Sequence, residues 1–285
     1  MSEGKNQAQK ELWNTSVGER WTRRQVDIDA MLAAFTQALM QAADLEGGPP
    51  QQVLDVGCGS GETSLMIADL GHTVTGVDIS TSLLDLAQRR AGDREGVTFM
   101  EADASDAVFH SPFDLLISRF GVMFFDDPQA AFIHMVQYLK PGGRVVFVCW
   151  RPPGENEWFT MPMQVLASVT EPPSPPPPDA PGPFAFADPE RVRSILTNAG
   201  LTDVKFTPAD AAMPMGSAKG AIKIAAYVME VGPAALPISL LPAEGVAMVR
   251  ERMTSAILPR LKDGHLSLGG SIWVVEARKA SGRAN

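Results

Sequence analysis

Residues 53–64 read Val-Leu-Asp-Val-Gly-Cys-Gly-Ser-Gly-Glu-Thr-Ser, and this stretch decides the fold. Its first four residues, 53–56, predict a buried strand, and the residues that follow the turn, 62–70, predict a helix. Three glycines separate the two elements: Gly57, Gly59 and Gly61. Glycines here let the backbone turn tightly and let a ligand approach the main chain and the helix N-terminus. The stretch therefore has the character of a nucleotide-binding turn.

The spacing of the three glycines indicates which class of nucleotide the turn would bind. It is G-x-G-x-G, whereas a nicotinamide or flavin fingerprint has G-x-G-x-x-G at the start of the helix. Glu62 stands where the helix begins, and its carboxylate would repel a pyrophosphate at the helix N-terminus. A cofactor without phosphates fits better. Asp55, two residues before the first glycine, suits a cofactor that carries an amino group.

Strand and helix patterns alternate along most of the chain. After the first strand, further strands are expected at residues 73–77, 97–100, 113–118, 144–150, 204–207 and 271–277. Such alternation is typical of a parallel sheet, because each crossover carries a helix. We predict an α/β fold of the Rossmann-like type, with seven mostly parallel strands, helices on both faces and lid insertions.

The regular pattern is extended at the N-terminus and interrupted twice. Residues 1–50 predict a helical cover whose amphipathic helix runs over about 21–42, preceded by a frayed segment over 1–14. Residues 51–285 form the predicted main domain, with insertions at 151–187 and 208–268, the second mostly helical. Both insertions leave the carboxyl edge of the sheet, where ligands bind in such folds, so both are candidate lids.

Two carboxylates follow neighbouring strands. Asp78 ends the second strand, 21 residues after Gly57, and can accept hydrogen bonds from both hydroxyls of a ribose. Asp103 follows the third strand and can accept the exocyclic amine of an adenine, with the Ala104 amide facing a ring nitrogen. Together with the glycine turn, these side chains predict an adenosine site.

The chain resembles the class I S-adenosylmethionine-dependent methyltransferases, in particular the small-molecule branch that includes ubiquinone and menaquinone biosynthesis enzymes. The resemblance rests on the glycine turn and on four further segments. These are Gly-Val-Asp-Ile-Ser (76–80), Glu-Ala-Asp-Ala (101–104), Phe-Asp-Leu-Leu-Ile-Ser (113–118) and Leu-Lys-Pro-Gly-Gly-Arg (139–144). It is close over roughly 50–150 and looser elsewhere.

The resemblance implies a role for each motif toward S-adenosylmethionine. The turn from Gly57 through Cys58 and Gly59 to Gly61 would carry the methionine portion, Asp78 the ribose, and Asp103 with Ala104 the adenine. Ile79 would lie against the adenine face. The end of the fourth strand would hold the methionine end through Ser118, Arg119 and Phe120, where Arg119 could pair with the cofactor carboxylate or with an acidic substrate.

The predicted function is methyl transfer to a small, apolar or aromatic acceptor. Methyl transfer depends mainly on positioning and desolvation, so no catalytic residue is assigned. A hydroxyl or carbon acceptor would need a general base, for which the candidates are His110, His134, His265 and nearby acids; His134 is expected to be structural. Aromatic residues near the expected site are candidates to shape the acceptor pocket: Trp13, Trp21, Phe120, Phe124, Phe125, Trp150 and Trp158.

Composition limits the partners. The formal charge of −9, from 24 basic and 33 acidic residues, argues against a nucleic-acid partner. Two cysteines give neither a disulfide framework nor a metal site, and no signal peptide or membrane span is apparent, so a cytoplasmic protein is expected. Two alternatives stay open: a non-catalytic S-adenosylmethionine-binding protein, and a nicotinamide-dependent oxidoreductase. The sequence does not specify the acceptor or the oligomeric state.

Overall fold

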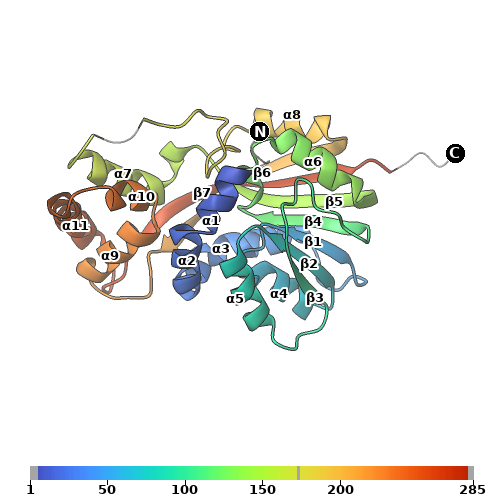
Figure 1. Ribbon diagram of the computed structural model, residues 1–285, viewed down its shortest axis with the longest axis horizontal. Coiled ribbons are helices and arrows are strands. Elements are labelled where there is room, and N and C mark those ends of the chain that lie inside the picture. The colour runs from blue at the N-terminus through green and yellow to red at the C-terminus, as the bar shows by residue number, and fades with distance from the viewer. Residues whose placement is uncertain (1–5, 172–173, 282–285) are drawn as a thin grey trace.

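The computed structural model describes residues 6–171 and 174–281, and one seven-stranded sheet organises them (Figure 1). The strand order is β3-β2-β1-β4-β5-β7-β6. Six strands run parallel and β7 runs antiparallel to both of its neighbours, β5 and β6. The strands are β1 (Gln52–Val56), β2 (Thr73–Asp78), β3 (Val97–Glu101), β4 (Phe113–Arg119), β5 (Leu139–Trp150), β6 (Leu201–Pro214) and β7 (Ser267–Lys279). The Rossmann-like α/β fold is confirmed.

Helices cover both faces of the sheet, and β5 shows how. Side chains alternate between the two faces of a strand, so Phe147 and Trp150 point to opposite sides. Phe147 packs against Phe132 of α6 (Pro128–Gln137), while Trp150 packs edge-on against Phe35 of α3 (Gln25–Ala43). The other helices of the sheet layer are α4 (Glu62–Asp69), α5 (Thr81–Ala91) and α8 (Pro189–Asn198), which packs on α6.

The N-terminal cover has three helices in place of the one that was predicted. α1 (Gln7–Trp13) and α2 (Ser16–Arg23) precede α3. The expectation that residues up to 14 are frayed was wrong for residues 6–14, because tertiary contacts hold α1: Asn6 is 3% exposed and bonds Asp126 and Asp103. Residues 1–5 of that segment lie outside the described part of the chain.

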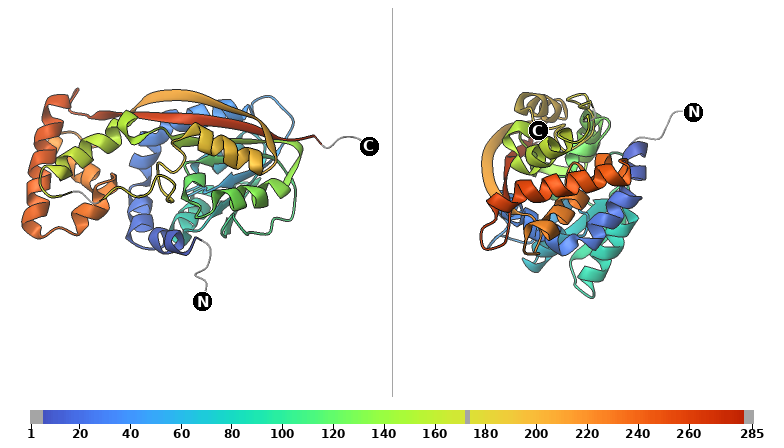
Figure 2. Two further views of the ribbon diagram at one scale, coloured as in Figure 1. Left: turned by 90° about the horizontal axis from the view of Figure 1, so that it is seen from above. Right: turned by 90° about the vertical axis from the view of Figure 1, so that its left-hand side faces the viewer.

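A second group of helices gathers beyond one end of the sheet, at the left of Figure 1 and of the left view of Figure 2. It consists of α7 (Glu157–Ala167), α9 (Ala221–Val231), α10 (Ala235–Ser239) and α11 (Ala243–Ile257). These helices come from the two segments that were expected as insertions. β6 continues to Pro214, so the first residues expected in the second insertion, from 208, are strand. That both segments act as lids stays a prediction.

Candidate functional site

The glycine turn has the backbone geometry that its sequence requires. Gly57, Gly59 and Gly61 have φ values of +68°, +54° and +79°, a region that residues with a Cβ rarely adopt. A Cβ on Gly57 would lie 2.8 Å from the Cα of Gly121, so backbone approaches backbone there. A Cβ on Gly59 would meet nothing closer than 4.0 Å. The main chain at Gly59 is therefore open to a ligand.

Asp78 joins the turn to the second strand. One carboxylate oxygen accepts the Gly59 N–H at 2.8 Å and the other accepts the Ser80 N–H at 2.8 Å. Burial raises the pKa of the Asp78 carboxyl, and the backbone N–H groups oppose that shift. The carboxylate thus stands beside the turn, where sequence analysis placed a ribose ligand.

Asp55 lies behind the turn and is fully buried. Its Oδ2 accepts the hydroxyls of Thr63 and Ser64 at 2.7 and 2.6 Å, which fastens the first turn of α4 to β1. Burial raises the pKa of this carboxyl above its usual value. Its Oδ1 has no hydrogen-bond partner among the described residues. The prediction that it serves the cofactor's amino group stays a prediction.

The Cys58 side chain turns away from the ligand side. It is 4% exposed, and a Cβ on Gly76 of β2 would lie 2.9 Å from its sulfur, so the thiol packs against the sheet. Burial raises the pKa of the thiol well above its ordinary value. Only the backbone of Cys58 is available to a ligand.

The N-terminal cover lies over the expected adenosine half of the site. The Asn6 carboxamide donates to both oxygens of Asp103, at 3.1 and 2.9 Å, and Lys10 lies 3.6 Å from the same carboxylate. The Asn14 side chain donates to the Ile79 carbonyl at 2.8 Å. Asp103 and its neighbour Ala104 are each 5% exposed. α1 and its flanking residues therefore contact the Asp103 carboxylate and the backbone of Ile79, the residue after Asp78.

The end of β4 closes the other side of the turn. The Ser118 hydroxyl donates to the Val56 carbonyl at 2.7 Å and accepts the Gly121 N–H at 3.1 Å, which ties β4 to β1. Phe120 has a φ of +62°, an uncommon conformation for a residue with a side chain that concentrates at functional sites. Its ring stacks on Trp150 at 4.3 Å between centroids.

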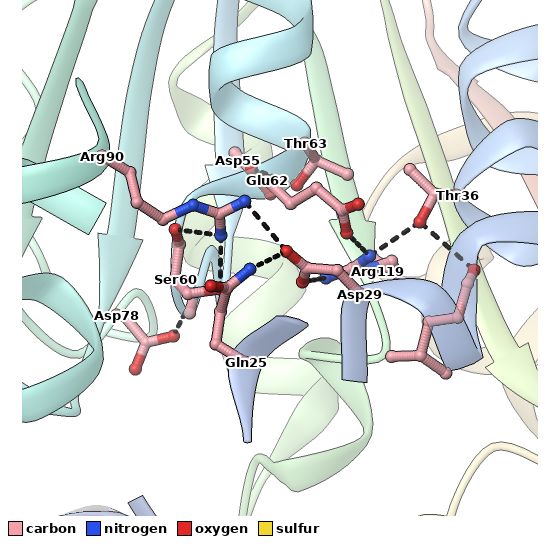
Figure 3. A network of polar contacts seen from close by, with 12 residues as sticks. Gln25, Asp29, Thr36, Asp55, Ser60, Glu62, Thr63, Asp78, Arg90 and Arg119 are labelled. Carbon is pink, nitrogen blue, oxygen red and sulfur yellow. Dashed lines mark hydrogen bonds and ion pairs between the residues drawn. The ribbon is translucent and has the colours of Figure 1, made fainter. Parts of the chain in front are cut away.

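Charged side chains meet beside the turn in a network that sequence analysis found only in part (Figure 3). Arg119 bonds Glu62 and donates to the Thr36 hydroxyl at 2.7 Å. Arg90 bonds Asp29 at 2.9 Å and the carbonyl and hydroxyl of Ser60 at 2.9 Å each. Asp29, Thr36 and Arg90 were missed. Asp29 could have been flagged as an acid that immediately follows a core position of an amphipathic helix.

Two of the three candidate bases lie at the surface and the third has a structural contact. His134 makes a 2.8 Å hydrogen bond with the Ala107 carbonyl and packs against Tyr138. His110 and His265 are exposed, and His265 pairs with Lys262 in a tight turn. The structure assigns none of them to the turn, and a general base stays unassigned.

Within the described residues, no cluster of three or more His, Cys, Asp or Glu side chains could hold a metal ion. Across those same residues, every helix is too short or too polar to cross a bilayer.

Comparisons with known proteins point to one family. Residues 54–147, about a third of the chain, match the sequence model of the methyltransferase domain. An uncharacterised protein of Mycobacterium tuberculosis is 38% identical over 125 residues, 43% of this chain and 44% of that protein. The demethylmenaquinone methyltransferase of Thermus thermophilus is 34% identical over 138 residues, 47% of this chain and 56% of that enzyme. The chain thus matches only about half the length of these curated relatives.

Solved structures confirm the fold. The magnesium protoporphyrin IX methyltransferase of Synechocystis, solved with bound S-adenosylhomocysteine, superimposes with a TM-score of 0.53 at 16% identity. The alignment covers 96% of this chain and 99% of that one. The methyltransferase family uses S-adenosylmethionine as its cofactor.

Proposed function

We propose that this chain, which carries a class I S-adenosylmethionine-dependent methyltransferase domain, transfers a methyl group from that cofactor to a small apolar or aromatic acceptor. One arrangement carries the proposal. The open glycine turn after β1, Asp78 at the end of β2 and Asp103 after β3 lie at the carboxyl ends of three adjacent parallel strands, so all three face one edge of the sheet. A nucleoside cofactor without phosphates matches that set of groups.

The contacts of these residues fit such a cofactor. The free space above Gly59 can admit the methionine portion to the main chain, and the Asp78 carboxylate beside it can accept ribose hydroxyls. The two oxygens of Asp103 already accept an amide NH2 group from Asn6, which is the same kind of donor as the exocyclic amine of adenine. Asn6 must give up that position when adenine binds.

When bound, the cofactor supplies an electrophilic methyl group on a sulfonium. The residues of the chain then have to hold the acceptor in line with that methyl and keep water away. The N-terminal cover contributes to the exclusion of water, since α1 lies over the adenosine half.

An aromatic cluster supports the choice of acceptor. Phe120 stacks on Trp150, and Trp150 contacts Trp158 of α7 at 4.7 Å between centroids. Trp158 in turn stacks on Phe184 at 6.1 Å, and Phe35 meets Trp150 from α3 at 5.3 Å. The cluster runs from the end of β4 into the segment 151–187. Aromatic side chains bind flat apolar rings well, and a ring facing the sulfonium stabilises it by about 1 kcal/mol.

Methyl transfer from labelled S-adenosylmethionine to a panel of phenols, quinols and amines tests the proposal. We expect labelled product from at least one aromatic acceptor, and reduced turnover with retained cofactor affinity in Trp158→Ala. Trp273→Ala is the matched control, because this tryptophan packs against Phe206 of β6 and against Arg151, which follows β5. Cofactor binding with no transfer to any acceptor would favour the non-catalytic alternative. Dinucleotide binding would favour an oxidoreductase.

The proposal also covers the class of partner and the cellular compartment. A formal charge of −9 supports a partner other than a nucleic acid. Both cysteines are free and buried, which fits a reducing cytoplasm.

A further inference from the structure

The polar network beside the glycine turn contains a carboxylate with an unused oxygen (Figure 3). Asp29 Oδ2 accepts hydrogen bonds from Arg90 and Gln25. Asp29 Oδ1 is buried and makes no hydrogen bond to the described residues, and the Arg119 Nη2 lies 3.9 Å from it. A buried acceptor without a donor is costly, so this oxygen is available to a ligand that brings one.

Arg119 and Glu62 complete the network. Arg119 is 12% exposed and bonds both Glu62 and the Thr36 hydroxyl. Burial raises the pKa of Glu62, Arg119 lowers it, and the negative charge of Asp29 raises it again. Two carboxylates therefore share one guanidinium at the start of α4, directly after Gly61.

The charges in this network balance. Asp29 and Glu62 are negative, and Arg119 and Arg90 are positive. A ligand that brought one unpaired charge into this mostly buried network would pay a desolvation cost without compensation. A ligand with an ammonium and a carboxylate adds no net charge. Its carboxylate can bind Arg119, while its ammonium takes the free oxygen of Asp29.

The amino-acid end of the cofactor has that chemistry and is expected at this place. The network touches the glycine turn directly, because Arg90 bonds Ser60 and Glu62 follows Gly61. Arg90 also fixes the Asp29 carboxylate relative to Ser60 through its second nitrogen, at 2.9 Å. Asp29 lies on α3, outside the residues that match the methyltransferase domain.

We propose that Asp29 binds the α-ammonium group of the cofactor's amino-acid end while Arg119 binds its carboxylate. The inference rests on the proposed function and adds a binding residue from the N-terminal cover. It also decides between the two partners of Arg119 that the sequence left open. It assigns to Asp29 the amino group that the sequence suggested for Asp55, because Asp55 is fully buried and bonds the first turn of α4. α3 thereby becomes part of the cofactor site, so the cover and the sheet bind the ligand together.

Calorimetry with three ligands tests this assignment: S-adenosylhomocysteine, its analogue without the α-amino group, and 5′-methylthioadenosine, which lacks the amino-acid end. We expect wild-type protein to bind the deaminated analogue at least about tenfold more weakly than S-adenosylhomocysteine. Asp29→Asn should weaken S-adenosylhomocysteine to a similar extent. It should leave the deaminated analogue and methylthioadenosine within about twofold of wild type, because the lost partner is absent from both.

Asp27→Asn is the matched control. Asp27 lies on the same helix and accepts the Ser217 N–H at 2.9 Å, so its loss should leave all three affinities unchanged. Equal binding of S-adenosylhomocysteine and its deaminated analogue by wild type would overturn the inference, and this arm requires no variant to fold. A uniform loss for all three ligands in Asp29→Asn would also overturn it, by showing that Asp29 only supports the pocket. If wild type bound none of the three, the proposed function would fail together with the inference.

Discussion

Replacing Asp78 by alanine separates the roles that the structure gives this carboxylate. Its two oxygens accept the Gly59 and Ser80 N–H groups at 2.8 Å each. In the proposed complex it also accepts ribose hydroxyls. The variant therefore has two consequences, one for stability and one for cofactor affinity, and both can be measured on the same preparation.

The expected magnitudes follow from the contacts. Hydrogen bonds to a charged acceptor contribute about 1.5 to 3 kcal/mol, so cofactor affinity should fall by roughly 10- to 150-fold. Each backbone N–H left without an acceptor costs about 1 to 3 kcal/mol when it stays buried, so the free energy of unfolding should fall by about 2 kcal/mol or more. Calorimetric titration with S-adenosylmethionine measures the first effect, and thermal denaturation measures the second.

Asp114→Ala is the matched control for this experiment. Asp114 lies near the start of β4 and makes the same kinds of bond, accepting the Gln52 N–H at 2.8 Å and pairing with Lys140 at 2.8 Å. Its removal should cost some stability and leave cofactor affinity unchanged. A folded Asp78→Ala protein with wild-type affinity would refute the ribose assignment. An equal loss of affinity in both variants would show that the titration reports stability alone.

Three further perturbations test other parts of the site. Asn6→Ala should raise cofactor affinity by roughly fivefold, because the Asn6 amide and adenine need the same oxygens of Asp103. Calorimetry measures this affinity, and a lower affinity in the variant would show that Asn6 is part of the binding site. Gly57→Ala should lower the free energy of unfolding by about 2 kcal/mol or more, since the φ of Gly57 is +68° and the added Cβ would lie 2.8 Å from a backbone carbon. Gly59→Ala should lower it by only about 1 kcal/mol, because the space around Gly59 is open. Urea denaturation measures both values, and equal losses would contradict this reasoning. Burial raises the pKa of Asp55 in the folded protein above its value of about 3.8 in the unfolded chain. The stability that the neutral carboxyl provides is therefore complete below the unfolded-state pKa and is lost as pH rises through the folded-state pKa. The side chain of Asp55→Asn stays neutral, so the melting temperature of this variant should rise relative to that of wild type as pH increases from about 4 to 8. A difference in melting temperature that does not change with pH would contradict the raised pKa.

The part of the fold that the sequence predicted rests on local patterns. A tight turn through Gly57, Gly59 and Gly61 was expected, and the structure gives these residues positive φ angles that glycine adopts at low cost. The alternation of strands and helices was sufficient to predict a mostly parallel sheet. The order of the last two strands did not follow from local pattern, because β7 inserts between β5 and β6. It pairs with β6 from Ser267 to Lys279 and with β5 over residues 272–278.

Strand lengths at that edge were underestimated for a physical reason. β6 reaches Pro214 through residues of low strand propensity, such as Pro208 and Asp210, and only pairing with β7 holds them extended. Pro208 is tolerated because β6 is an edge strand. Single-sequence patterns carry no information on such pairing.

The residues of the candidate site could likewise be predicted only in part. Asp78 and Asp103 could be predicted because each ends or follows a recognisable strand. The contacts of Asn6 and Asp29 could not be predicted, because their partners lie far away in sequence: Asn6 bonds Asp103 and Asp29 bonds Arg90. Their roles depend on how the N-terminal cover packs on the sheet, which is a tertiary property.

A calorimetric titration of the purified protein with S-adenosylmethionine and with a nicotinamide dinucleotide tests whether the turn from Gly57 to Gly61 binds S-adenosylmethionine. We predict saturable binding of S-adenosylmethionine at one site per chain and no heat from the dinucleotide. Binding of the dinucleotide without binding of S-adenosylmethionine would contradict it, because the spacing of the glycines and the carboxylate of Glu62 at the start of α4 would then have been misread.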